Sequence, residues 1–135
     1  MKLAYLDSAV WISRFEGLPT YKKIINAHLN ELSKNGWTFC ASEAVILEVM
    51  IKPYRDNNTE VTKAYNEVFE QTLLLKELPN VFEIALMIAQ GENLKAMDAI
   101  HVAIAVQHGC KRFVSTDPHF KNLKIMPSTW IDLTQ

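Results

Sequence analysis

Leu3-Ala4-Tyr5-Leu6-Asp7-Ser8 is the stretch of the chain that decides the fold. Four apolar residues follow one another without a polar residue between them, and an acid and a serine come directly after. Strands of a parallel sheet are covered on both faces, so they show a continuous apolar run instead of alternation. The stretch predicts a short strand inside a parallel sheet, with Asp7 and Ser8 just beyond its carboxyl end.

Helical and strand patterns alternate along the rest of the chain. Apolar residues recur at helical spacing, and glycine, proline and polar turn residues separate the segments. Pro53, Gly91 and Gly109 are expected to end three of the helices. The expected helices cover residues 9–12, 21–34, 43–52, 59–76, 81–90 and 96–108. The expected strands are 3–6, 37–41, 113–115, a short one near 78–80 and a last one formed by 125–126 and 130–131.

This alternation predicts an α/β fold. Strands that alternate with helices imply right-handed crossovers and a parallel sheet covered by helices on both faces. The length of 135 residues fits a single domain, residues 1–135. Ligands of such sheets bind outside the carboxyl ends of the strands, so the polar residues at those ends are the first candidates for a functional site.

The composition is that of an ordinary globular protein, with 49% hydrophobic and 21% charged residues. The formal net charge of -1 excludes nucleic-acid binding by overall basicity, but 14 Lys and Arg residues leave room for a local basic patch. Cys40 and Cys110 are interpreted as buried or incidental thiols that suit a reducing compartment. Asp7 interrupts the first apolar run too early for a secretory signal, and no run is long enough to span a membrane. We expect a cytoplasmic protein with no membrane partner.

Two acids stand out in the first half of the chain. Asp7 follows a buried strand, where an acid is costly unless it is paired or binds a metal; the alternative is a helix cap. Glu48 is surrounded by apolar neighbours and either faces a cleft or occupies an exposed position on a partly buried helix. Glu43 competes with it, but lies about 140° around the same helix. Its place in the first turn is already explained by the helix dipole.

Two more acids stand out in the second half. Asp98 opens a helix that is apolar on almost every side, and a helix cap is the alternative role. Asp117 follows the strand at 113–115, and its alternative role is to open the turn at Pro118. Acids gathered at one sheet edge repel one another unless protons or cations neutralise them. Oxygen ligands favour Mg²⁺ or Mn²⁺ over zinc, and such an ion can activate water against a phosphodiester.

The stretches around these acids resemble the motifs of PIN-domain nucleases, in order and spacing over essentially the whole chain. The combination of the first, third and fourth stretches is the most specific part of this resemblance. Thr116 stands where many relatives have Asn, and His119 where many have an acid. The resembling stretches are Tyr5 to Ile12, Ser42 to Val49, Met97 to Ala103 and Val114 to Phe120.

The resemblance implies a Rossmann-like three-layer α/β/α fold with a parallel sheet of four to five strands. It implies an endoribonuclease that uses one or two Mg²⁺ or Mn²⁺ ions and leaves a 5′-phosphate and a 3′-hydroxyl. The length suits a VapC-type toxin, which implies a homodimer and a cognate antitoxin. The implied catalytic residues are Asp7, Glu48, Asp98 and Asp117, of which Asp7, Asp98 and Asp117 hold metal. The implied supporting residues are Ser8, Ser115 and Thr116.

Several other residues have two possible roles. Basic side chains close to Asp117 in the sequence can steer RNA phosphates, or can simply form a solvated surface. For the tryptophans, core packing is preferred over stacking on bases. His101, three residues after Asp98, is interpreted as a packed or hydrogen-bonded helix histidine instead of a ligand. The basic residues in question are Lys111, Arg112, His119, Lys121 and Lys124, and the tryptophans are Trp11, Trp37 and Trp130.

Two other functions are possible for such a chain: a phosphatase and an inactive binding module. A phosphatase of the haloacid-dehalogenase type needs a second Asp two residues after the first, where this chain has Ala9, and a glycine-rich phosphate loop is absent. The stronger rival is an inactive PIN-like module for RNA binding or protein assembly, against which the four intact acids count. Apolar positions around Tyr65-Val68-Phe69-Leu73 suit a dimer interface or a buried core equally.

Overall fold

The computed structural model describes residues 1–134, and a five-stranded parallel sheet forms its centre. The strand order is β3-β2-β1-β4-β5, and every neighbouring pair is parallel. The α/β fold with a parallel sheet of four to five strands is thus confirmed. The strands are β1 (Lys2–Leu6), β2 (Trp37–Ser42), β3 (Leu73–Leu75), β4 (Arg112–Ser115) and β5 (Ser128–Trp130).

β1 is the central strand, as the apolar opening stretch predicts. Ala4, Tyr5 and Leu6 are at most 1% exposed, because β2 and β4 flank the strand and helices cover both of its faces. The two thiols also lie in this interior. Cys40 and Cys110 are buried and free, with their Sγ atoms 3.7 Å apart. Their interpretation as buried thiols is confirmed.

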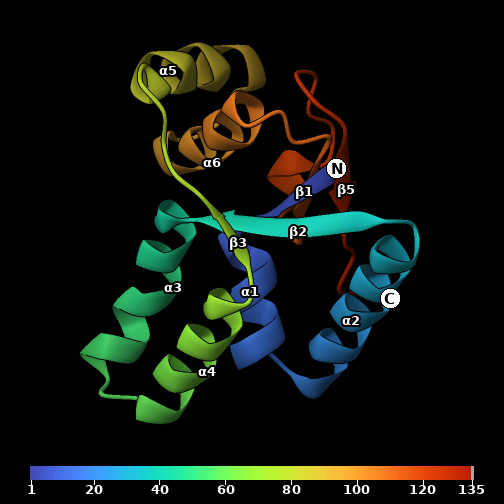
Figure 1. Ribbon diagram of the computed structural model, residues 1–135, viewed down its shortest axis with the longest axis vertical. Helices are drawn as coiled ribbons and strands as arrows, with labels where there is room; N and C mark the ends of the chain where they lie inside the picture. Colours follow the sequence, from blue (N-terminus) through green and yellow to red (C-terminus); the bar gives the residue numbers. More distant parts are fainter. Residues whose placement is uncertain (135) are drawn as a thin grey trace.

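Helices cover the two faces of the sheet unequally (Figure 1). Four helices lie on one face, and α5 and α6 pair on the other. The two groups follow from topology, since the chain steps outward from β1 to β3 and then crosses back to β4. The helices are α1 (Ser8–Glu16), α2 (Pro19–Lys34), α3 (Glu43–Arg55), α4 (Thr59–Glu70), α5 (Val81–Glu92) and α6 (Ala96–Gln107), with a 3₁₀ turn at Pro118–Phe120.

Several predicted boundaries were wrong. α3 runs past Pro53, which lies in its last turn and accepts a hydrogen bond from the Asn58 N–H at 2.8 Å. α4 ends at Glu70, and the third strand is Leu73–Leu75 instead of lying near 78–80. α5 includes Gly91 and ends at Glu92, and Asn93 caps it with a φ of 56°, which asparagine tolerates. The last strand is Ser128–Trp130, which overlaps the two predicted pieces only at Trp130.

An aromatic cluster packs α1 against α4. Trp11 and Phe69 meet edge to face at 5.1 Å, and Phe15 stacks on Tyr65 at 4.8 Å. Trp11, Tyr65 and Phe69 are at most 5% exposed. Tyr65 and Phe69 therefore belong to the core, whereas Val68 is half-buried and Leu73 is 43% exposed. Trp11 is a core residue as predicted. Within residues 1–134, no helix is both long and apolar enough to cross a membrane.

Candidate active site

Asp7 and Asp117 meet at the carboxyl edge of the sheet. β1 and β4 are parallel, with Leu6 aligned to Val114, so the residues that follow both strands come out together. The Ser115 hydroxyl donates to Oδ2 of Asp7 at 2.8 Å and accepts from the Asp117 N–H at 2.9 Å. Ser115 thereby links the side chain of Asp7 to the backbone of Asp117.

Glu48 joins this edge from α3. Ser8, the first residue of α1, donates its hydroxyl to Oε1 of Glu48 at 2.6 Å, and Nε2 of His101 contacts the same oxygen. Three helices are thus connected at one carboxylate. Glu43, the competing candidate, is exposed in the first turn of α3. The geometry favours Glu48 over Glu43, as the helical spacing predicts.

Helix capping is the alternative role of Asp7, Asp98 and Asp117, and the structure shows a side-chain cap only for Asp117. Asp7 precedes α1 but makes no capping hydrogen bond with its side chain. Asp98 is the third residue of α6 and not the residue that opens it, because Lys95 holds the capping position. Asp117 does cap the turn at Pro118, since its Oδ1 accepts the His119 N–H at 2.9 Å. Capping thus explains Asp117 in part, and explains neither Asp7 nor Asp98.

Burial and neighbouring charge shift the pKa values of these acids. Burial raises the pKa of Asp7 to about 7, although the hydrogen bond from Ser115 opposes the shift. Burial, and then the nearby charge of Asp117, raises the pKa of Asp98. The hydrogen bond with His101 lowers the pKa of Glu48. Two carboxyl groups of the cluster therefore hold protons more tightly than free acids do, as expected where negative charges are gathered out of water.

One polar atom at this edge has no partner. Asp7 is 4% exposed, and its Oδ1 is buried without a hydrogen bond in the described part of the chain. A buried carboxylate oxygen without a partner is costly unless a cation or a proton satisfies it. A divalent cation fits this oxygen and the other carboxylates of the edge.

A second observation concerns Asp98, Asp117 and His119. One ligand atom from each of the three lies within 4.8 Å of the others. Asp7, expected as a metal ligand, is not part of this group and is linked to it through Ser115. The sequence predicts only phosphate steering for His119, although its position two residues after Asp117 also fits a ligand role. Nδ1 of His119 lies 3.4 Å from Oδ1 of Asp117.

Other residues that were singled out are divided between the two edges of the sheet. Lys111 and Arg112 lie at the amino end of β4, away from the acids, and Arg112 packs over the Trp37 ring at 5.1 Å. The structure therefore does not bring these two basic residues or Trp37 to the site. Lys121 follows the turn at Pro118, with its Nζ 4.6 Å from the centre of the Trp130 ring.

Thr116 and Lys124, two further residues of the predicted site, form hydrogen bonds through their backbone atoms. The Thr116 carbonyl accepts from the indole N–H of Trp130 at 3.2 Å. The Lys124 N–H donates to the carboxylate of Glu92 at the end of α5. Trp130 is half-buried beside the acidic edge, so it is neither a full core residue nor a free stacking platform.

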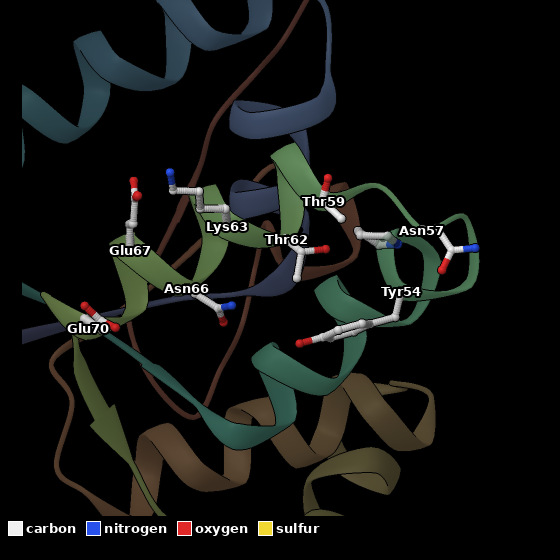
Figure 2. Close-up of a pocket in the computed structure, with 9 residues that line it drawn as sticks. Tyr54, Asn57, Thr59, Thr62, Lys63, Asn66, Glu67 and Glu70 are labelled. Atoms are coloured by element: carbon white, nitrogen blue, oxygen red, sulfur yellow. The ribbon is translucent and has the colours of Figure 1, made fainter.

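A polar hollow lies elsewhere, between α3 and α4 (Figure 2). Tyr54, Thr62, Asn66 and Glu70 are among the residues that line it, and none of the four predicted acids does. Its charged lining residues are one lysine and two glutamates, Lys63, Glu67 and Glu70, and these glutamates are not part of the His, Cys, Asp and Glu group that could hold a metal. We place the functional site at the acidic edge of the sheet instead.

The fold and the site together define a class: a small parallel α/β domain with acidic residues gathered at the carboxyl edge of its sheet. The chain belongs to the PIN domain family, whose model matches residues 4–125. No curated protein sequence matches the chain.

Solved structures share this fold at low sequence identity. The VapBC2 structure from Rickettsia felis, bound to a promoter DNA fragment, is 14% identical with a TM-score of 0.76; the match covers 96% of this chain and 99% of that one. FitAcB from Neisseria gonorrhoeae is 17% identical with a TM-score of 0.63 and coverage of 93% and 95%. VapC20 from Mycobacterium tuberculosis, described as a toxin that cleaves the sarcin-ricin loop, is 14% identical with a TM-score of 0.65 and coverage of 87% and 92%.

Proposed function

We propose that this protein is a divalent-metal-dependent endoribonuclease and the toxin of a type II toxin–antitoxin pair. The observation that carries the proposal is the meeting of Asp7, Glu48, Asp98 and Asp117 at one sheet edge, with a buried oxygen of Asp7 lacking a partner. Membership in the PIN domain family supports a nuclease, and the VapBC and FitAcB structures of similar fold support the toxin assignment.

The metal would be held by Asp98 and Asp117, with Asp7 and His119 beside them. Carboxylate ligands suit both Mg²⁺ and Mn²⁺, and an imidazole favours Mn²⁺ of the two. When bound, the ion would lower the pKa of a water molecule and neutralise charge on the scissile phosphate. One ion is enough for this arrangement, and the imidazole at position 119 leaves one carboxylate fewer for a second.

Glu48 is the residue best placed to handle the proton in this scheme. Its pKa is lowered by the hydrogen bond with His101, so at neutral pH it is ionised and can accept a proton from the attacking water. Water attack on phosphorus with cleavage of the bond to the 3′-oxygen leaves a 5′-phosphate and a 3′-hydroxyl. Asp7, linked to Asp117 through Ser115, holds the two strand ends in register at the site.

Partners follow from the toxin assignment. A cognate antitoxin is proposed because the Rickettsia felis and Salmonella typhimurium structures of similar fold are VapBC complexes. A homodimer and a cytoplasmic location are proposed on the same grounds. The proposed substrate is RNA, and the sites of cleavage would identify which RNA it is.

Cleavage of a cellular RNA pool tests the proposal. The wild type is incubated with Mg²⁺ or Mn²⁺ beside Asp7→Asn and Asp98→Asn, with Glu43→Gln as a matched control on the exposed side of α3. We expect discrete products from the wild type and the control, none from the two Asn variants, and none from any protein in excess EDTA. A wild type that binds metal and cuts no RNA would instead support an inactive binding module.

A further inference from the structure

A buried chain of hydrogen bonds ends at Glu48. The Tyr5 hydroxyl lies 2.7 Å from Oγ of Ser42 and 2.7 Å from Nδ1 of His101. Nε2 of His101 contacts Oε1 of Glu48. Tyr5, Ser42 and His101 are all at most 2% exposed, so no member of the chain exchanges its partner for bulk water. Such networks hold their members rigidly when every group is satisfied.

The directions of these bonds follow from the chemistry of the groups. With Glu48 ionised and His101 in a neutral form, the carboxylate only accepts, which assigns the hydrogen to Nε2 and leaves Nδ1 to accept from the Tyr5 hydroxyl. The Tyr5 oxygen then accepts from the Ser42 hydroxyl. Ser42 in turn accepts the N–H of Val45 at 3.3 Å, as the cap of α3. The chain therefore runs in one direction from the start of α3 to the carboxylate in its middle.

This arrangement excludes one role for His101 and leaves another. A neutral imidazole has a single ring lone pair, and here Tyr5 occupies it. In this tautomer neither ring nitrogen of His101 is free to bind a metal. Within the described part of the chain, Ser8 and His101 both contact the Glu48 carboxylate at Oε1, and Oε2 makes no hydrogen bond.

We propose that Tyr5 and His101 are positioning residues for Glu48: they fix one carboxylate oxygen so that the other serves the reaction. A glutamate in mid-helix has three rotatable side-chain bonds, and its side chain is 32% exposed here, so it needs such a hold. The inference rests on the proposed nuclease function. It adds to the four acids a chain of hydrogen bonds that runs from Tyr5, on the central strand, through His101 to Glu48.

Removal of a single hydroxyl tests the inference. Tyr5→Phe keeps the ring, which stacks on Phe113 at 5.3 Å, and deletes only the hydroxyl, and with it the hydrogen bonds to His101 and Ser42. Tyr65→Phe is the matched control, because it deletes another buried hydroxyl, bonded to Glu16 at 2.6 Å outside the acidic edge. We expect Tyr5→Phe to lower kcat by about 10- to 100-fold with little change in KM, since misplaced groups cost that much. The control should keep the wild-type kcat.

A conservative replacement of His101 adds a second comparison. His101→Gln retains an N–H that can reach Glu48, whereas His101→Leu does not. The inference predicts that Gln restores part of the kcat lost with Leu, at equal folded fraction by circular dichroism. Equal kcat for the two variants would assign His101 a packing role only.

Nitrogen NMR of His101 shows which ring nitrogen carries the hydrogen, and it needs no cleavage assay. We expect a protonated Nε2 and an unprotonated Nδ1 in the wild type, and a changed Nδ1 shift in Tyr5→Phe but not in Tyr65→Phe. The opposite neutral tautomer, or a wild-type kcat in Tyr5→Phe, would overturn the inference and leave the nuclease proposal intact. A wild type that cuts no RNA would overturn the nuclease proposal, and with it the need to position Glu48.

Discussion

At the scale of single residues, the buried carboxyl group of Asp7 sets both stability and chemistry. Its pKa of about 7 means that the folded protein binds a proton there more tightly than the unfolded chain does. Folding is therefore favoured by this group below about pH 4, and that contribution is lost as the pH rises through about 7. Asp98 acts in the same direction, and half-buried Glu48, with its lowered pKa, acts in the opposite one.

Asp7→Asn should for this reason stabilise the metal-free protein at pH 8. The amide avoids the cost of burying a charge, and we expect the free energy of unfolding to rise by about 1–3 kcal/mol. Thermal unfolding in EDTA at pH 5 and pH 8 measures it, and the gain should be smaller at pH 5. An equal or lower melting temperature of the variant at pH 8 would contradict the assignment of a buried, costly charge.

The imidazole of His119 makes a second prediction at this scale. If His119 takes part with Asp98 and Asp117, bound Mn²⁺ should show coupling to a nitrogen nucleus in electron spin echo spectra. His119→Gln should abolish that coupling and lower the affinity for Mn²⁺ more than the affinity for Mg²⁺. His28→Gln, on α2, is the control and should leave both unchanged. A wild type that binds Mn²⁺ without nitrogen coupling would limit the ligands to carboxylates.

At the scale of the elements, the sequence predicts the helices and strands that have a clear apolar pattern of their own. It does not predict those that depend on contacts with other parts of the chain. The apolar run before Asp7 marks β1, and the apolar run after Asp98 marks α6. β3 was missed because Leu73–Leu75 follows α4 directly and continues its apolar pattern, so only pairing with β2 makes it a strand. The place of His119 near the acids depends on the turn at Pro118, which spacing alone does not define.

The aromatic cluster gives a prediction about the elements. Phe69→Ala removes a ring that is 5% exposed and meets Trp11 at 5.1 Å, so we expect unfolding to become easier by about 3–5 kcal/mol. Leu73→Ala, at a 43% exposed position, should cost less than about 1 kcal/mol. Denaturant unfolding compares the two. Similar small costs would show that Phe69 does not belong to the core.

At the scale of the whole molecule, charge is divided between the two edges of the sheet. The acids lie at the carboxyl edge, together with Lys121, whereas Lys111 and Arg112 lie at the amino end of β4. The formal net charge of -1 gives no general attraction for RNA. Binding of RNA at the acidic edge must therefore depend on the metal and on nearby cations.

Lys121→Gln should then raise KM for RNA a few-fold and weaken its dependence on salt, because one phosphate contact is lost. Exposed Lys111, at the opposite edge, is the matched control, and Lys111→Gln should leave KM and the salt dependence unchanged. Cleavage at two or three salt concentrations separates the variants. A larger effect of Lys111 would place the RNA at the amino edge and contradict the site.

The chemical nature of the cut ends tests the central claim most directly. RNA cleaved by the pure protein with Mn²⁺ is treated with a ligase and a kinase that distinguish 5′-phosphate from 5′-hydroxyl ends. Metal-assisted attack of water at the acidic edge predicts 5′-phosphate and 3′-hydroxyl ends that disappear in Asp98→Asn. Ends with a 5′-hydroxyl and a 2′,3′-cyclic phosphate, or no cleavage at all, would contradict the account.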